Sequence, residues 1–76
     1  MHISGVLVKA RPERLAGIEK TLAGMAGVEV HGSHEDGRLV VTVEQGDAGQ
    51  LCDALLHMQN LPGVLSASMI YHHFEA

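Results

Sequence analysis

A pattern that occurs twice constrains the fold of this chain of 76 residues more than any other feature. In each half, apolar residues at helical spacing are followed by a glycine turn and then by residues typical of a strand. These transitions are Met25-Ala26-Gly27-Val28 in the first half and Leu61-Pro62-Gly63-Val64 in the second. The repeat predicts two similar halves, each built as strand, helix and strand.

The individual elements follow from periodicity and turn residues. Strands are predicted over residues 2–10, 28–31, 39–44 and 63–73, and helices over the stretches that begin at Pro12 and Asp47. The helices carry apolar stripes, formed by Leu15, Ile18, Leu22 and Met25 in the first and by Leu51, Ala54, Leu55 and Met58 in the second. Asp36 and Gly37 suit a tight hairpin turn in which both residues take positive φ, so the flanking strands are expected to be antiparallel.

Two split strand-helix-strand units with right-handed crossovers build a ferredoxin-like sandwich of the α+β class. We therefore expect one domain, residues 1–76, with a four-stranded antiparallel sheet in the order 4-1-3-2 and both helices on one face. Such an arrangement leaves the other face of the sheet without a covering layer. What that uncovered face binds becomes the functional question.

The last strand is expected to have two different faces. Alternation assigns one set of its residues to the core and the other set to the uncovered face. The first set is Leu65, Ala67, Met69 and Tyr71, and the second is Val64, Ser66, Ser68, Ile70 and His72. Small serines in the middle of the outward set would leave space above the sheet.

The same alternation predicts the composition of the whole uncovered face. Its expected members are Ile3, Gly5 and Leu7 from the first strand, Glu29 and His31 from the second, Val40, Thr42 and Glu44 from the third, and Ser66, Ser68, Ile70 and His72 from the fourth. An apolar centre with acidic flanks is more typical of an interaction surface than of a solvated sheet face. Packing of two such faces into a homodimer is as plausible from composition as binding of a foreign ligand.

Composition argues against several classes of partner. A net charge of −4 and an aromatic content of 3% are unfavourable for binding nucleic acid. The apolar run Val6-Leu7-Val8 is too short to span a bilayer, and no signal peptide opens the chain, so we expect a cytoplasmic location without membrane attachment. Cys52 is the single cysteine and lies in an apolar helical pattern with no evident base, which suits a core residue better than a nucleophile.

The histidines raise a metal hypothesis, which the spacing does not favour. His72 and His73 are neighbours on a strand and point to opposite faces, while His31 and His34 have no cysteine or carboxylate at zinc-ligand spacing. A metal chaperone of this fold would need paired cysteines after the first strand, where this chain has Lys9-Ala10-Arg11-Pro12. We therefore expect no metal site, no cofactor and no catalytic residues, which indicates a protein that is not an enzyme.

Several stretches together resemble the NapD family over nearly the whole chain. They are residues 63–73, with the sequence GVLSASMIYHH, and residues 10–15, 27–30, 37–41 and 43–44. The resemblance implies a small cytoplasmic chaperone that binds the twin-arginine signal peptide of the catalytic subunit of the periplasmic nitrate reductase. Such binding holds back export until the molybdenum cofactor is in place. Some members have a longer acidic C-terminal tail, whereas this sequence ends at Phe74-Glu75-Ala76.

The implied ligand fits the predicted face, since a basic segment followed by an apolar one matches acidic flanks around an apolar centre. The peptide could lie on the face as an amphipathic helix or add a strand to a sheet edge, and small Gly5, Ser66 and Ser68 favour the helix. The protein itself is expected to be a monomer or a weak homodimer. A different hypothesis is a small-ligand-sensing regulatory domain that dimerises through its open sheet face.

Overall fold

The computed structural model describes residues 1–74, so the difference from tailed family members at residues 75–76 lies outside the described part. The strands are β1 (His2–Ala10), β2 (Val28–Ser33), β3 (Arg38–Gln45) and β4 (Val64–Phe74), and the helices are α1 (Leu15–Ala23) and α2 (Ala48–Gln59). A short 3-10 turn, Pro12–Arg14, precedes α1. The predicted order of elements is confirmed.

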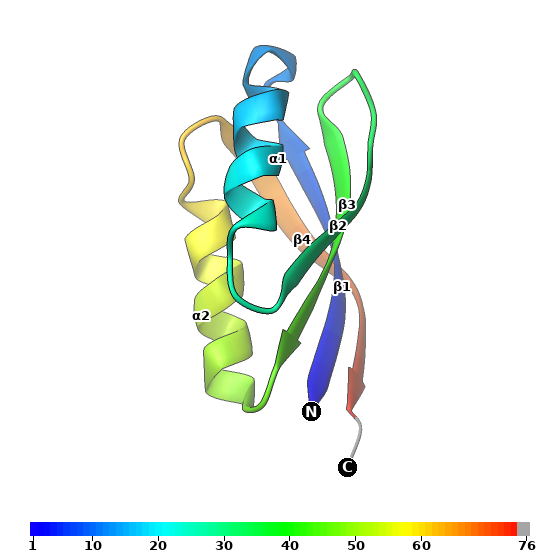
Figure 1. Ribbon diagram of the computed structural model, residues 1–76, viewed down its shortest axis with the longest axis vertical. Coiled ribbons are helices and arrows are strands. Elements are labelled where there is room, and N and C mark those ends of the chain that lie inside the picture. Colours follow the sequence, from blue (N-terminus) through cyan, green and yellow to red (C-terminus); the bar gives the residue numbers. More distant parts are fainter. Residues whose placement is uncertain (75–76) are drawn as a thin grey trace.

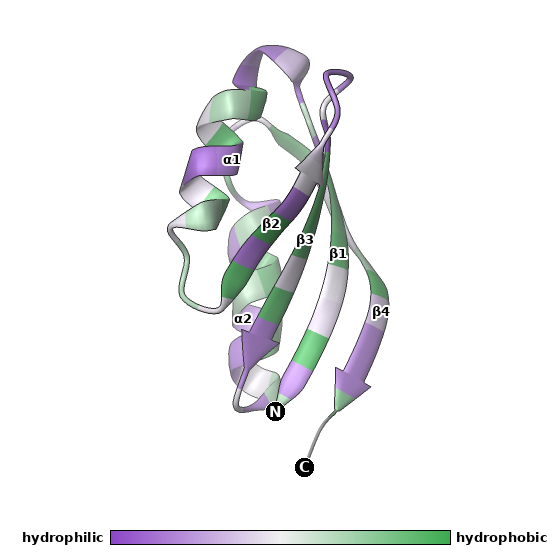
Figure 2. Cartoon of the chain, turned by 45° about the vertical axis from the view of Figure 1, so that its right-hand side comes forward, coloured by the Kyte–Doolittle hydropathy of each residue, from purple (hydrophilic) through white to green (hydrophobic). Residues whose placement is uncertain are grey.

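The strands form one antiparallel sheet in the order β2-β3-β1-β4, and both helices lie on one of its faces (Figure 1). This is the predicted ferredoxin-like arrangement. Figure 2 shows the sheet with the helices behind it and no element in front. The opposite face, which we call the open face, is therefore available along all four strands.

The core fills the space between the sheet and the helices. Leu39, Val41 and Val43 of β3 are fully buried, as the alternation of that strand predicts. The helices bury the predicted stripes: Ile18, Leu22, Leu51 and Met58 are buried, and Leu15, Met25, Ala54 and Leu55 pack against them. Burial of these apolar side chains supplies the main force that holds both helices on one face of the sheet.

Local signals fix the start of each helix. The Asp47 carboxylate accepts a hydrogen bond from the Gln50 backbone N–H at 3.0 Å, which satisfies one of the free donors at the start of α2. Pro12 begins the 3-10 turn, in which Leu15 N–H bonds to the Pro12 carbonyl. The first helix therefore starts as a tighter turn than the sequence predicted, and its α-helical part begins at Leu15.

The β2–β3 hairpin differs from its predicted form. Within the hairpin turn, Gly37 has a positive φ of 103°. Asp36 does not, since every residue with positive φ between 1 and 74 is a glycine, so Asp36 does not take the mirror-image turn conformation. The turn is instead closed by Gly37 N–H donating to the His34 carbonyl at 2.9 Å. The longer loop allows the Gly37 carbonyl to accept a hydrogen bond from Ala10 N–H, which joins the hairpin tip to the end of β1.

Two irregularities in β4 correct the predicted faces of that strand. The register with β1 shifts between Lys9 and Ala10 and again between Gly5 and Val6, which leaves Leu65 and Ile70 as extra residues. Because of the first shift, Val64 pairs with Ala10 and packs against the core. Leu65 is 64% exposed. The assignments of Val64 to the open face and of Leu65 to the core were therefore wrong.

The second shift exchanges the faces of the end of β4. Tyr71 pairs with Gly5 of the open face, and His72 pairs with Ser4, whose side chain is buried on the helix side. Both predictions for these residues were wrong, since an extra residue moves every later side chain to the other face. Ala67 is buried as expected, but Met69 stays 45% exposed although it pairs with buried Val6.

Paired alanine substitutions test the first bulge. Val64→Ala should lower the free energy of unfolding by about 1 kcal/mol, because it removes methyl groups that touch the core. Leu65→Ala should change it by less than about 0.5 kcal/mol, because that side chain is exposed. Urea denaturation of both variants gives the two values, and a larger loss for Leu65→Ala than for Val64→Ala would contradict the observed register.

Candidate functional site

The open face is organised in rows of side chains that the strand register places side by side. Leu7 of β1 pairs with Val40 of β3 and with Ser68 of β4, so these three form one row across the face. Val40 is 43% exposed and Leu7 is partly buried. This row is the apolar centre that the sequence predicted, with a small side chain on the β4 side.

The next row contains the main surprise of the site. Gly5 pairs with Thr42 on one side and with Tyr71 on the other. The Tyr71 ring lies directly over Gly5, since a Cβ built on this glycine would overlap the ring. Gly5 is buried, so the free space expected above it is occupied by an aromatic ring that is itself 51% exposed. Tyr71, not Gly5, forms the surface here.

The β2 side of this row is polar. Glu29 pairs with Thr42, and the Thr42 hydroxyl shares a hydrogen bond of 2.7 Å with His31 Nε2. His31 is the extra residue of a register shift in β2, and its ring lies 4.0 Å from a Glu29 carboxylate oxygen. The predicted placement of Glu29 and His31 on the open face agrees with these contacts.

An acidic hollow of about 250 Å³ lies where β2 begins and β3 ends. It is lined by Gly27, Val28, Thr42 and the two acidic residues Glu29 and Glu44. Gly27 (φ 76°) allows the chain to enter β2 close to β3, and its carbonyl accepts a hydrogen bond from Glu44 N–H at 2.7 Å. A side chain at Gly27 would collide with the Glu44 carbonyl oxygen. The glycine therefore holds the start of β2 against the end of β3, where Glu29 and Glu44 line the same hollow.

A second, apolar hollow of about 280 Å³ lies farther along the same two strands. It is lined by Leu7, Val40, Gly32 and Ser33, with His34 and Arg38 at its end. Its walls are mainly carbon, which suits an apolar side chain. The acidic and apolar hollows thus lie along β2 and β3 on the same face. The row that contains Gly5, Thr42 and Glu29 borders the acidic hollow.

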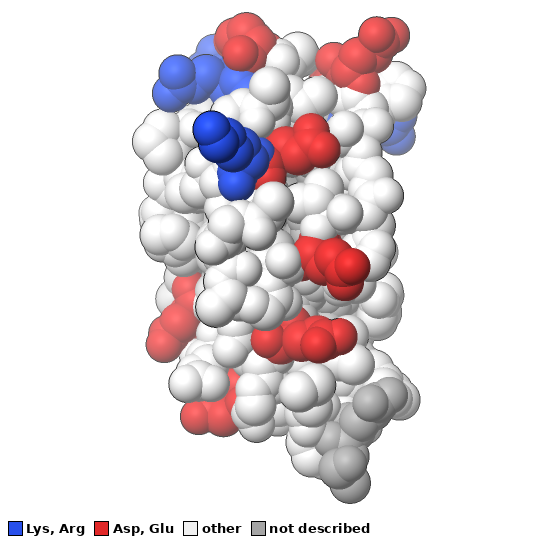
Figure 3. Space-filling model, viewed as in Figure 1, with Lys and Arg blue, Asp and Glu red and all other residues white. Residues whose placement is uncertain are grey.

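Beyond the apolar hollow the open face ends in basic residues. Lys9 pairs with Arg38, and Ser66 completes this row on β4. Arg38 Nε lies 2.9 Å from a carboxylate oxygen of Asp36, and the hydrogen bond from Arg38 lowers the pKa of Asp36 below its usual value. In Figure 3, the visible Lys and Arg side chains are confined to the upper part of the molecule, while Asp and Glu continue to its lower part.

The structure brings together nearly all of the predicted contact residues on the open face. Ile3 pairs with Glu44, which lines the acidic hollow, and the other predicted residues lie in the rows described above. Ile70 is 58% exposed but has no direct partner on β1, because it is the extra residue of the second shift. Sequence reasoning missed Tyr71 and His73, which the second shift moves to this face. Nothing in the sequence around Tyr71, three residues after Ser68, indicates an extra residue between them.

The described residues offer little to a metal ion. Residues 1–74 contain no group of three or more His, Cys, Asp or Glu side chains arranged to hold one. His2 Nδ1 and His72 Nε2 are 3.1 Å apart, a pair that the sequence did not predict, and Ser4 Oγ lies 3.3 Å from the other ring nitrogen of His72.

Cys52 is exposed on α2, not buried as expected. Within the described part of the chain, neither helix has the length and apolar character needed to cross a membrane.

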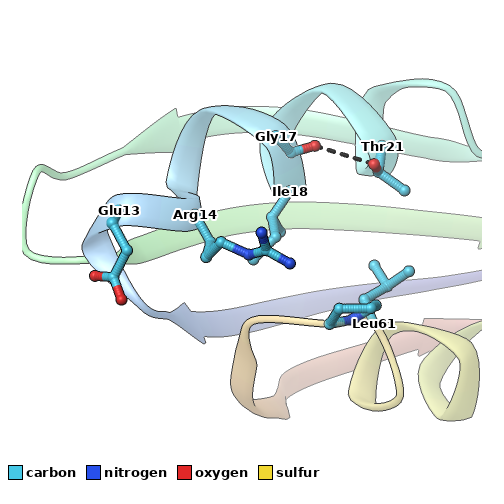
Figure 4. A pocket seen from close by; sticks show the side chains of 7 residues that line it. Glu13, Arg14, Gly17, Ile18, Thr21 and Leu61 are labelled. Carbon is cyan, nitrogen blue, oxygen red and sulfur yellow. Dashed lines mark hydrogen bonds between the residues drawn. The ribbon is translucent and has the colours of Figure 1, made fainter.

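A separate hollow of about 390 Å³ lies on the helix side (Figure 4). It opens between α1 and the turn that joins α2 to β4, with Ile18 and Leu61 in its wall. Figure 4 shows the Arg14 guanidinium group beside Ile18, and Glu13 at one end pointing away from it. The Thr21 hydroxyl donates to the Gly17 carbonyl at 3.0 Å beside it. The Arg14 guanidinium lies directly beside the apolar Ile18 side chain (Figure 4), so charge and apolar surface are not separated here as they are on the open face.

Comparison with known proteins agrees with this architecture. The model of the family described as NapD protein matches residues 1–76. Chaperone NapD of Escherichia coli K12 is 34% identical over 75 residues, which cover 97% of this chain and 86% of the relative. The solution structure of the E. coli Tat proofreading chaperone NapD matches with a TM-score of 0.86 and covers 96% of this chain and 78% of the other.

A transcriptional regulatory protein of the AsnC family from Pyrococcus furiosus also matches, with a TM-score of 0.77 and 18% identity, over 99% of this chain and 52% of that chain. At this identity the likeness shows the fold alone, so it does not favour the alternative of a regulatory domain. The family model and the E. coli relative both span nearly all of the sequence. The chain therefore belongs to the NapD family, and its function is that of a chaperone.

Proposed function

We propose that the protein binds the twin-arginine signal peptide of the periplasmic nitrate reductase catalytic subunit on its open face. The observation that carries the proposal is the presence of an acidic hollow and an apolar hollow on one uncovered sheet face. A guanidinium group suits the carboxylates of Glu29 and Glu44, and an apolar segment suits Leu7 and Val40. The E. coli relative is a Tat proofreading chaperone, which supports the same class of ligand.

The proposed contact surface consists of the predicted residues with one replacement, because Gly5 is buried beneath the Tyr71 ring. It comprises Ile3, Leu7, Glu29, Val40, Thr42, Glu44, Ser66, Ser68 and Ile70, together with Tyr71 in place of Gly5. Tyr71 offers a broad, partly apolar contact of the kind enriched in interfaces. The Ser68 side chain leaves room beside it for the body of a peptide helix.

A helix is the conformation of the peptide that this surface favours. The open face presents the side chains of its strands to a ligand. An added strand would instead pair with the backbone at the outer edge of β2 or β4 and leave both hollows unused. Ordering a disordered segment costs about 2–5 kcal/mol of the gross interaction energy. Binding should therefore be reversible, which suits a chaperone that later releases the signal peptide for export.

The proposed setting is the cytoplasm, where a signal peptide is accessible before export. Binding alone would hold back export of the catalytic subunit during insertion of its cofactor, so the proposed role needs no catalysis and no cofactor of its own. The protein would act as a monomer or a weak homodimer. A dimer formed through the open face would compete with the peptide for the same residues.

A Ser68→Arg substitution tests the location of the site. The long charged side chain should obstruct the open face and weaken peptide binding at least about tenfold, or about 1.4 kcal/mol. The free energy of unfolding should change by less than about 0.5 kcal/mol, because Ser68 is exposed. Calorimetric titration with a synthetic twin-arginine signal peptide and urea denaturation give the two quantities.

The matched control is Ala16→Arg, which adds the same charge at an exposed position of α1 on the other side of the molecule. It should bind the peptide nearly as well as the unmodified protein. Normal binding by Ser68→Arg, or equal losses for both variants, would rule out the open face as the site.

Glutamine substitutions test the charge component. Glu29→Gln and Glu44→Gln should each weaken binding by about 0.2–1 kcal/mol, the range of partly exposed ion pairs. The losses should shrink when the peptide arginines are replaced by glutamine, and affinity should fall as salt is raised. Glu13→Gln, on the helix side, is the control with the same charge change. Losses that persist with the glutamine peptide would show that these carboxylates do not contact the arginines.

A further inference from the structure

We propose that the signal peptide binds the open face in one direction only. Its arginines lie over Glu29 and Glu44, and its apolar helix runs across Leu7 and Val40 toward Lys9. The peptide axis therefore follows the direction of β1, from Ile3 to Lys9. This inference rests on the proposed function, since it specifies how the same site receives the same ligand.

The two ends of the open face differ in charge. At one end Glu29 and Glu44 line a hollow, and at the other Lys9 pairs with Arg38. Arg38 is partly neutralised by Asp36, at 2.9 Å, whereas Lys9 forms no ion pair with any residue between 1 and 74. The apolar row of Leu7 and Val40 lies between the two ends. The face is thus acidic, then apolar, then basic along β1.

The length of the face matches the ligand. Lys9 follows Ile3 by six residues of β1, which corresponds to about 20 Å of strand. A helix of about 13 residues has this length, because each residue adds about 1.5 Å. The apolar segment of a signal peptide has about 7–15 residues. A helical peptide anchored by its arginines in the acidic hollow would therefore end its apolar segment near Lys9.

The helix macrodipole favours the same direction. The N-terminal end of a helix carries a partial positive charge and its C-terminal end a partial negative charge. In the proposed direction the positive end and the arginines meet Glu29 and Glu44, and the negative end meets Lys9. In the reverse direction the arginines would meet Lys9 and Arg38, so both charge terms would become repulsive.

Paramagnetic labelling of the peptide tests the direction. Two synthetic twin-arginine signal peptides would carry a nitroxide, one beside the arginines and one at the end of the apolar segment. Amide signals of the isotope-labelled protein are compared with those measured with a reduced, diamagnetic label. The first peptide should broaden Ile3 and Glu44 most, and the second should broaden Lys9 and Arg38 most.

The outcomes separate this inference from the proposed function. A reversed pattern, or equal broadening of both ends by each label, would overturn the single direction while leaving peptide binding on the open face intact. Broadening confined to the helix side, or failure of the unlabelled peptide to bind, would overturn both.

A charge-neutralising variant gives an independent readout. Lys9→Gln should weaken binding about two- to fivefold relative to Lys20→Gln, because Lys9 faces the negative end of the helix. Lys20→Gln is the matched control, since it removes the same charge from α1 on the other layer. Tighter binding by Lys9→Gln than by Lys20→Gln would mean that the arginines lie beside Lys9, and it would overturn the proposed direction.

Discussion

The structure depends on the pairing of β1 with both β3 and β4. This strand lies inside the sheet, and its Val6 and Val8 are fully buried beneath the helices. Its other face contributes Ile3, Leu7 and Lys9 to the open face. Because β1 supplies core and surface at alternate positions, the packing that holds the helices also fixes the spacing of its side chains on the open face.

Most of the fold could be predicted from the sequence, because periodicity and turn residues agree with the final packing. Helix stripes such as Ile18 and Leu22, and the alternation of β3, follow directly from what each element buries. The hairpin was less predictable, since Asp36-Gly37 permits a two-residue turn but a longer loop gains a hydrogen bond to Ala10. That bond joins residues far apart in the sequence, which local rules cannot detect.

The open face was predictable on three strands and only partly on the fourth. Leu65 and Ile70 are ordinary strand residues, and nothing in their side chains marks them as the extra residues of two register shifts. Their effect is large because each shift reverses the alternation between the residues on its two sides, so that Val64 and Leu65 at the first shift and Tyr71 and His72 at the second lie opposite to their predicted faces. The predicted contact residues through Ser68 keep their place, while Tyr71 and His72 exchange theirs.

The Tyr71 ring above Gly5 has one further consequence. The chain contains one tyrosine and no tryptophan, so its near-ultraviolet absorption and intrinsic emission arise mainly from this ring. The ring is half exposed in the middle of the open face. A ligand that covers it changes its solvation directly. The unmodified protein therefore contains its own optical reporter for anything that covers the open face, and it needs no attached dye.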